Sequence, residues 1–389
     1  MKKYGLLLLL LFCFVIAPVS AFTAESDAVP KHDISLRLEL ENAIGKGLTW
    51  LAGSQFPQGH WSQAEYPALT ALALIAFQGD PSNYYKIKFE TNIKNGYDYL
   101  LTNVKPDGGI YGKDLANYNT SISMVALQMA NQPLYEQILK NARKFIIGLQ
   151  DDFGEKGETD DPFDGGIGYG GRYKHSDMSN TSFALEALYY TRYLKTDENV
   201  DQADKDLNWE AALKFISRSQ NLTATNDQDW ASDDPANKGG FIYFPGNTKV
   251  KESPEAQGQQ PLRSYGSISY AGLLSLVYAD LGKDDPRVKA VLEWLANNYT
   301  LDENPGMGPE GHFFYLHAMA KALSAADVQY LTLSDGTKVN WRKELAHKLL
   351  NLQKADGSWV NDNGRWWERD PNLVTSYATV ALEIVYRGL

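Results

Sequence analysis

Two short stretches, Gln55-Phe56-Pro57-Gln58-Gly59-His60-Trp61 and Gln353-Lys354-Ala355-Asp356-Gly357-Ser358-Trp359, share the pattern Q-x-x-x-G-x-W near opposite ends of the chain. Each follows a segment with apolar residues at helical spacing and precedes a second helical segment, such as the Ala- and Leu-rich residues 68–76. The glycine permits a tight turn, and the tryptophan is large enough to hold neighbouring helices together. The two stretches therefore predict turns between paired helices.

The same arrangement recurs four more times between these copies, so the chain contains six helix pairs. Weaker turns, with glycine near a Tyr, Phe or Met residue, lie at 107–111, 164–169, 239–243 and 306–308. Acidic insertions between Gln150 and Gly166 and between Gln220 and Gly240 lengthen the spacing of the middle copies. Because no β-rich run separates the pairs, the repeats predict an all-α fold.

The two helices of a pair differ in polarity. The second helix, as at Ala68–Leu74, has no charged face and should be buried all round. The first helix keeps a polar face, as at Lys140, Arg143 and Lys144, and should lie outside. Inner helices surrounded by outer ones predict a closed (α/α)6 toroid, because an open solenoid needs polar capping repeats at its ends.

Composition excludes several classes of protein. The chain has 389 residues, of which 43% are hydrophobic, so it is not intrinsically disordered as a whole. There are 37 Lys and Arg residues against 48 Asp and Glu, which gives a net charge of -11. This acidity argues against nucleic acid or anionic lipid as the main partner. The length by itself would allow two or three domains, but six repeats predict one toroid.

The first residues are typical of a secretory signal peptide. Lys2 and Lys3 precede a short apolar run over residues 6–16, and Val19-Ser20-Ala21 supplies small residues for cleavage. We therefore expect a signal peptide at 1–21, an N-terminal extension at 22–40 and the toroid at 41–389, in a secreted or periplasmic protein that does not span a membrane after cleavage. A retained anchor is the alternative. The single cysteine, Cys13, leaves with the signal peptide, which excludes disulfides and thiolate ligands.

The repeated Q-x-x-x-G-x-W pattern resembles the prenyltransferase and squalene-oxidase repeat family, which includes squalene cyclases. The resemblance covers the whole chain after the signal peptide and implies a six-hairpin α/α toroid. It also implies a hydrophobic or isoprenoid-like ligand. In physical terms the motif Gln can bond helix-end groups while the Trp stacks on the neighbouring pair, so both are structural staples.

The chain departs from the motifs that carry the family's chemistry. Class II terpene cyclases of the family use a D-x-D-D-T-A motif, and the similar stretch here is residues 177–182, with Ser179 at the central acid and Asn180 at the last. A serine cannot protonate an alkene, so ordinary cyclisation is not expected. Protein prenyltransferases of the family hold zinc with Asp, Cys and His. The lack of a mature cysteine argues against that site, and no metal or cofactor is predicted.

Polar residues at the entrances of the second helices are the candidate site residues, because these entrances line one mouth of the implied toroid. A carboxylate near a histidine can act as an acid/base couple, which makes Asp177 with His175, and Glu310 with His312, the candidate catalytic residues. Asp177 has an alternative role as a helix N-cap, and Glu310 as a first-turn acid that matches the helix dipole.

Aromatic and polar side chains at the same places are candidate ligand-binding residues. They are Tyr118, Asn119, Tyr173, Asn180, Arg263, Tyr265, Tyr315, Trp366 and Trp367. For the two tryptophans, covering the barrel end is the alternative. The acidic insertions offer oxygen ligands for calcium but lack EF-hand spacing, which favours solvated loops.

The most favoured function is the binding of a hydrophobic or isoprenoid-like molecule in the central cavity. In a catalytic version of this hypothesis, the protein also transforms that molecule. An alternative is a polysaccharide-active α/α-toroid enzyme, a glycosidase or lyase, which would need paired carboxylates or a Tyr/His base facing an open cleft. A second alternative is a binding or scaffold module without chemistry. The expected partner is a small hydrophobic molecule or a glycan in the cavity, and not nucleic acid.

Overall fold

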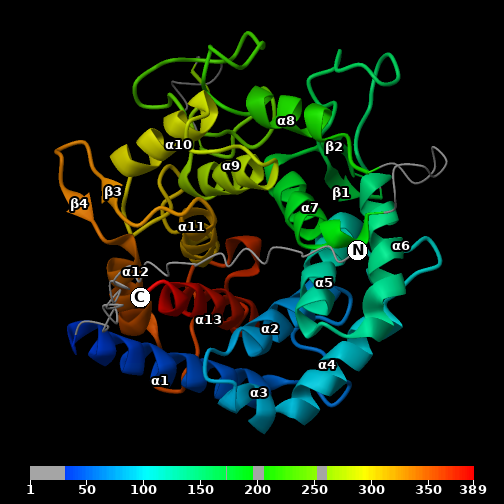
Figure 1. The fold of residues 1–389 in the computed structure, drawn as a ribbon, viewed down its shortest axis with the longest axis vertical. Coiled ribbons are helices and arrows are strands. Elements are labelled where there is room, and N and C mark those ends of the chain that lie inside the picture. Colours follow the sequence, from blue (N-terminus) through cyan, green and yellow to red (C-terminus); the bar gives the residue numbers. More distant parts are fainter. Residues whose placement is uncertain (1–30, 172, 196–205, 252–260) are drawn as a thin grey trace, which may run out of the picture.

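The computed structural model describes residues 31–171, 173–195, 206–251 and 261–389, and it contains two concentric layers of helices in this part of the chain (Figure 1). The inner helices are α2 (Pro67–Gly79), α5 (Ala116–Ala130), α7 (Met178–Tyr190), α9 (Gly266–Tyr278), α11 (His312–Ala325) and α13 (Pro371–Arg387). The outer helices are α1 (Lys31–Ser54), α4 (Glu90–Thr102), α6 (Glu136–Ile147), α8 (Trp209–Arg218), α10 (Pro286–Asn297) and α12 (Trp341–Leu352).

Short elements join these helices. They are α3 (Tyr84–Lys88), the 3-10 turns η1 (Pro133–Tyr135), η2 (Arg192–Leu194) and η5 (Arg365–Trp367), and two small antiparallel hairpins. One hairpin pairs β1 (Gly168–Gly170) with β2 (Tyr173–Ser176), and the other pairs β3 (Leu331–Thr332) with β4 (Lys338–Val339). These hairpins lie in connections, so the fold is all-α as predicted.

The ring of inner helices is closed. Each inner helix packs against the next in chain order, and α13 packs against α2. The first outer helix, α1, also packs against the last inner helix, α13. The predicted (α/α)6 toroid is therefore confirmed, with the hydrophobic core between the two layers. No helix in the described part of the chain combines the length and apolar character needed to cross a membrane.

Side-chain burial explains which helix is inner. Helix α2 has buried residues along its whole length and carries no charge. Helix α6 buries only one stripe, which includes Leu139, Ala142 and Ile146. Arg143 was predicted to face outward with Lys140, but it is buried: its guanidinium donates to the Leu188 carbonyl oxygen at 2.7 Å and so satisfies the C-terminal end of α7.

The repeated glutamines join successive pairs through the same two hydrogen bonds. Gln55 Nε2 donates to the carbonyl oxygens of Gly59, at 2.8 Å, and Asn92, at 2.9 Å, which ties its turn to the next outer helix. Gln353 Nε2 bonds Gly357 and Ala43 in the same way and joins the sixth pair to the first. Gln150 and Gln220 make equivalent bonds in the middle of the chain. The motif therefore acts as a structural staple.

The motif tryptophans fill the space that the turns enclose. Trp61 and Trp359 are fully buried, and each indole Nε1 donates to a carbonyl oxygen of the preceding outer helix, that of Leu51 at 2.7 Å and Leu349 at 2.8 Å. The turn glycine that precedes Trp359 has a φ of +95°, and a Cβ there would lie 2.7 Å from the Lys46 carbonyl oxygen. Glycine is required because the turn is left-handed and the next helix is in contact.

The ends of the predicted domains are only partly described. The predicted signal peptide at 1–21 and residues 22–30 lie outside the described residues. Helix α1 runs unbroken from Lys31 through the expected boundary at residue 41, and Leu36 and Leu40 on it belong to the core. Residues 31–40 therefore form the beginning of the first outer helix, while the domain division itself stays a prediction.

Candidate functional site

A cavity of about 340 Å³ lies along the barrel axis and reaches the C-terminal ends of the inner helices. Every inner helix contributes to the wall, α9 with Tyr278 and the others with residues at helical spacing, as α7 does with Phe183, Glu186 and Tyr190. The last residues of α2, α7, α9 and α13 also line it, so the cavity extends to the mouth where these helices end. This volume is within the usual range of small-molecule sites.

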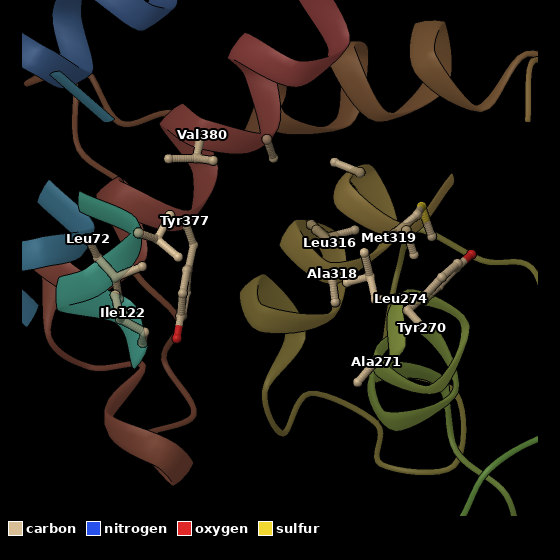
Figure 2. Packing of buried hydrophobic residues seen from close by; sticks show 14 of the residues in the cluster. Leu72, Ile122, Tyr270, Ala271, Leu274, Leu316, Ala318, Met319, Tyr377 and Val380 are labelled. Carbon is tan, nitrogen blue, oxygen red and sulfur yellow. The ribbon is translucent and has the colours of Figure 1, made fainter. Parts of the chain in front are cut away.

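One half of the cavity wall is mainly apolar. It comes from three neighbouring helices, α13, α2 and α5, and its apolar residues are Leu72, Ile75, Ile122, Val125, Met129, Val380 and Ile384. Figure 2 shows Leu72, Ile122 and Val380 on one side of the barrel and buried residues of α9 and α11 on the other. The apolar residues of this half can bury the apolar surface of a ligand.

The other half of the wall is polar and comes from α7, α9 and α11. Lys321 Nζ donates to both carboxylate oxygens of Glu186, with 2.5 Å to Oε2, and the two side chains are 17% and 9% exposed. Tyr190 and Tyr278 stand next to this pair, and burial raises their pKa values, to about 12 for Tyr190, with the Glu186 charge adding to the effect. The cavity thus has one apolar side and one ion-paired side.

His317 lies in the same polar half as a neutral side chain. Its Nδ1 lies 3.3 Å from the Tyr377 carbonyl oxygen, so Nδ1 carries the proton and Nε2 is an acceptor. Burial, together with the neighbouring charge of Lys321, lowers the pKa of His317 to about 3. Two effects that disfavour the imidazolium keep this residue uncharged at neutral pH.

A layer of aromatic rings lies on the side of the cavity that faces the opposite mouth, where the inner helices begin. Phe183 lines the cavity and contacts Tyr118 and Phe314, with ring centroids 5.2 and 6.1 Å apart. Phe314 in turn contacts Tyr377, whose ring centroid is 5.9 Å away. Burial raises the pKa of Tyr118 to about 12, so its hydroxyl keeps its proton. Of the predicted ligand-binding residues, Tyr118 lies in this layer, on α5.

At that opposite mouth, Asp177 is the N-cap of α7. Its Oδ1 accepts from the Asn180 backbone N at 2.9 Å and its Oδ2 from Asn180 Nδ2 at 2.8 Å. Burial raises the pKa of Asp177 to about 6, although the bonds from Asn180 oppose the shift. Burial and the Asp177 charge raise the pKa of Tyr265. The structure therefore brings Asp177, Asn180 and Tyr265 together and confirms the N-cap alternative, while an acid role stays a prediction.

His175 precedes Asp177 on β2. Its ring packs on Phe244, with centroids 5.0 Å apart, and its Nδ1 lies 3.4 Å from the Ser176 carbonyl oxygen. Among the described residues, no hydrogen bond joins the His175 ring to the Asp177 carboxylate. Tyr173 begins β2, but its side chain lies outside the described residues.

Three further predicted ligand-binding residues lie apart from the cavity. Asn119 is buried, and its Oδ1 accepts from the Ala68 backbone N at 3.0 Å at the start of α2. The Tyr315 hydroxyl donates to the Thr300 carbonyl oxygen at 2.8 Å, in the layer between inner and outer helices. Arg263 has an exposed side chain. Hydrogen bonds of the fold therefore occupy Asn119 and Tyr315.

Glu310 and His312 do not form a couple. Glu310 pairs with Lys251, at 2.6 Å, and with Arg365, at 3.2 Å. His312 Nε2 donates to the Leu301 carbonyl oxygen at 2.9 Å, and burial lowers the pKa of its ring. The two side chains are thus held by different partners, which the sequence spacing did not indicate.

Trp366 and Trp367 lie in η5, over the mouth where the inner helices begin. Trp367 packs on Tyr66, with ring centroids 4.7 Å apart, and the Trp366 ring lies against Gly311. The two side chains are 42% and 36% exposed. The following Glu368 is buried and accepts from the Phe314 backbone N at 2.7 Å, which fixes the loop at the start of α11. These contacts agree with the alternative in which the tryptophans cover the barrel end.

Comparison with solved structures identifies the fold. A variant of the type II terpene cyclase MstE from Scytonema, in complex with the substrate geranylgeranyl dihydroxybenzoate, matches with a TM-score of 0.54 at 12% identity, over 90% of this chain and 98% of that chain. Another variant, in complex with the product merosterolic acid A, matches with a TM-score of 0.53 at 11% identity, over 91% and 98%. No family model and no curated protein matches.

The chain has the terpene cyclase fold. At these identities the likeness establishes the fold and not the reaction. Within this fold, Ser179 lies in the first turn of α7, half-buried, where the motif resemblance expects the central acid. The first turn of α7 therefore carries no carboxyl group besides the capping Asp177.

The most strongly polar residues of the cavity were missed by the sequence reasoning. Glu186, Lys321 and Glu383 are isolated charged residues inside inner helices that are otherwise almost uncharged. A charge inside a helix expected to be buried on all sides is a signal in itself, because it needs a partner or a ligand. Within the described ranges, no group of three or more His, Cys, Asp or Glu side chains is placed to hold a metal ion.

Proposed function

We propose that the protein binds a hydrophobic, isoprenoid-like molecule in the cavity between its inner helices. One observation carries this proposal: the wall formed by α13, α2 and α5 is mainly apolar, while the wall across the axis carries the Glu186–Lys321 pair. Burial of apolar ligand surface supplies the binding free energy, about 25 cal/mol per Å². The polar wall then orients the end of the ligand that carries oxygen.

The terpene cyclase fold supports this choice of ligand class. The MstE structures hold geranylgeranyl dihydroxybenzoate or merosterolic acid A. Catalysis by the family's acid motif is not proposed, because Ser179 cannot replace a carboxylic acid. The glycan alternative is not proposed either, because the cavity wall is largely apolar and the predicted Glu310 and His312 are bound to other partners.

Binding is tested by titrating the protein with geranylgeraniol in an isothermal calorimeter. Val125→Phe adds a ring to the apolar wall and should weaken binding at least tenfold, whereas Val125→Ala, the matched control, should keep affinity within about threefold. Absence of binding to the original protein, or equal affinity of the Phe variant, would contradict the proposal.

Export remains a prediction from residues 1–21. Protein recovered from the periplasm or the medium should have the intact mass expected for cleavage after Ala21. A full-length mass in the cytoplasmic fraction would contradict it.

A further inference from the structure

Glu383 is an ionisable residue in the wall of the cavity, and no structural role in the fold explains it. It lies on α13, lines the cavity between Val380 and Arg387, and is 1% exposed. Its carboxyl group lies over Gly79 at the end of α2, where a Cβ would come within 1.8 Å of Glu383 Oε2. Gly79 therefore leaves the space that the carboxyl group occupies.

The carboxyl group lacks the partners that a buried carboxylate needs. Among the described residues, nothing forms a hydrogen bond to Glu383 Oε1. The nearby Arg387 donates to the Gly79 carbonyl oxygen at 2.6 Å. Asp80, the nearest acid, accepts from the backbone N of Ser82 and Tyr85 and adds only like charge. An ionised carboxylate in such a place is strongly disfavoured, so the group holds a proton.

The electrostatic surroundings of the carboxyl group agree with this geometry. Burial raises the pKa of Glu383 well above its usual range, with Arg387 opposing and Asp80 adding to the shift. A protonated carboxyl group has one O–H donor besides its acceptor oxygens. Leaving such a group unbonded in the core destabilises a protein, whereas a leucine of similar length would pack there without that cost.

We infer that Glu383 is a ligand-binding residue whose protonated carboxyl group bonds an uncharged oxygen, a hydroxyl or carbonyl, at one end of the isoprenoid-like ligand. This inference rests on the proposed function. A diphosphate or other anionic end fits less well, because Lys321 is already paired with Glu186 and Arg387 is bonded to Gly79. The site therefore selects an isoprenoid alcohol, aldehyde or ketone over a hydrocarbon or a diphosphate ester.

The test compares three probes on the full-length protein: geranylgeraniol, the matching hydrocarbon in which hydrogen replaces the hydroxyl group, and geranylgeranyl diphosphate. The original protein should bind the alcohol about tenfold more tightly than the hydrocarbon, which is the usual worth of one buried hydrogen bond. Glu383→Leu should reduce this preference to less than twofold by weakening only alcohol binding. Glu383→Gln, which keeps a neutral donor and acceptor, should retain part of the preference.

Two independent readouts accompany the affinities. Infrared difference spectra at neutral pH should show the C=O band of a protonated carboxylic acid that shifts when geranylgeraniol binds and is missing in Glu383→Gln. The melting temperature of ligand-free Glu383→Leu should rise, which also shows that this variant folds.

The outcomes separate the inference from the proposed function. If the original protein binds none of the probes, the proposed function fails. If it binds alcohol and hydrocarbon equally, or the diphosphate most tightly, or if Glu383→Leu keeps the full preference, only the assignment of Glu383 is overturned.

Discussion

Lys321→Met should be the most destabilising single substitution in the cavity wall, because it leaves the Glu186 carboxylate without its cation. Removing one partner of a buried ion pair costs about 3–5 kcal/mol. Both side chains border a cavity that water can enter, so we expect the loss of unfolding free energy to fall at or just below this range, roughly 2–3 kcal/mol. The methionine itself fits the site, since it has nearly the length of the lysine stem.

The measurement is urea unfolding followed by circular dichroism, with the midpoint and the slope fitted separately. A shift of the midpoint at constant slope reports a change of stability. Glu186→Leu combined with Lys321→Met replaces the pair by apolar groups and should recover stability to within about 1 kcal/mol of the original protein.

The outer helix α6 supplies a matched control pair. Lys140 and Glu136 are separated by four residues, with an N–O distance of 2.7 Å and side chains 37% and 53% exposed. Lys140→Met should cost no more than about 0.5 kcal/mol. The reasoning fails if Lys321→Met costs no more than this control, or if the double variant is less stable than Lys321→Met alone.

Three further predictions concern the pH response and the repeat turns. The pKa of His317 is about 3 in the folded protein and 6.5 in the unfolded chain. Its contribution to the free energy of unfolding is therefore fully present above pH 6.5 and is lost as the pH falls towards 3. Unfolding free energies measured from pH 7 to 4 should decline less steeply in His317→Gln than in the original protein. Trp359→Ala should cost about 3–5 kcal/mol because the indole is fully buried, whereas Trp366→Ala at the exposed barrel end should cost less than about 1 kcal/mol; equal melting temperatures would contradict the staple role. Gly357→Ala should cost at least about 1 kcal/mol, since φ is +95° and the next helix leaves no space, whereas Gly53→Ala in α1, with no atom within 4 Å, should be neutral or stabilising in the same denaturation assay.

The fold was predictable because residues of the repeated motif themselves make the contacts between neighbouring helices. The Gln and Trp of each full motif bond carbonyl oxygens of adjacent helices, so two copies of the pattern already imply how one pair meets the next. Arg143 shows the limit of this reasoning: helical spacing placed it on the polar face, but the end of α7 lies within reach of its guanidinium. Long side chains can turn towards a neighbour that spacing does not reveal.

The candidate site was harder to predict, because polar residues at helix entrances serve two purposes. Asp177 and Asn119 satisfy backbone N–H groups at the starts of α7 and α2, which every buried helix end requires. Their residue types are the same for capping and for catalysis, so sequence spacing does not separate the two. The lone charges of α7, α11 and α13 were the better signal, since nothing in their own helices explains them.

The sequence by itself determined the all-α class, the six pairs, the order of inner and outer helices and the absence of the cyclase acid at Ser179. These follow from local periodicity and from residue type, which do not depend on distant contacts. Only the tertiary structure decided that Glu186 meets Lys321 across 135 positions of the chain, and that Glu383 lies over Gly79 without a partner. Closure of the ring brings α7, α11 and α13 around one axis, and that arrangement places three ionisable side chains, isolated in the sequence, in the wall of one cavity.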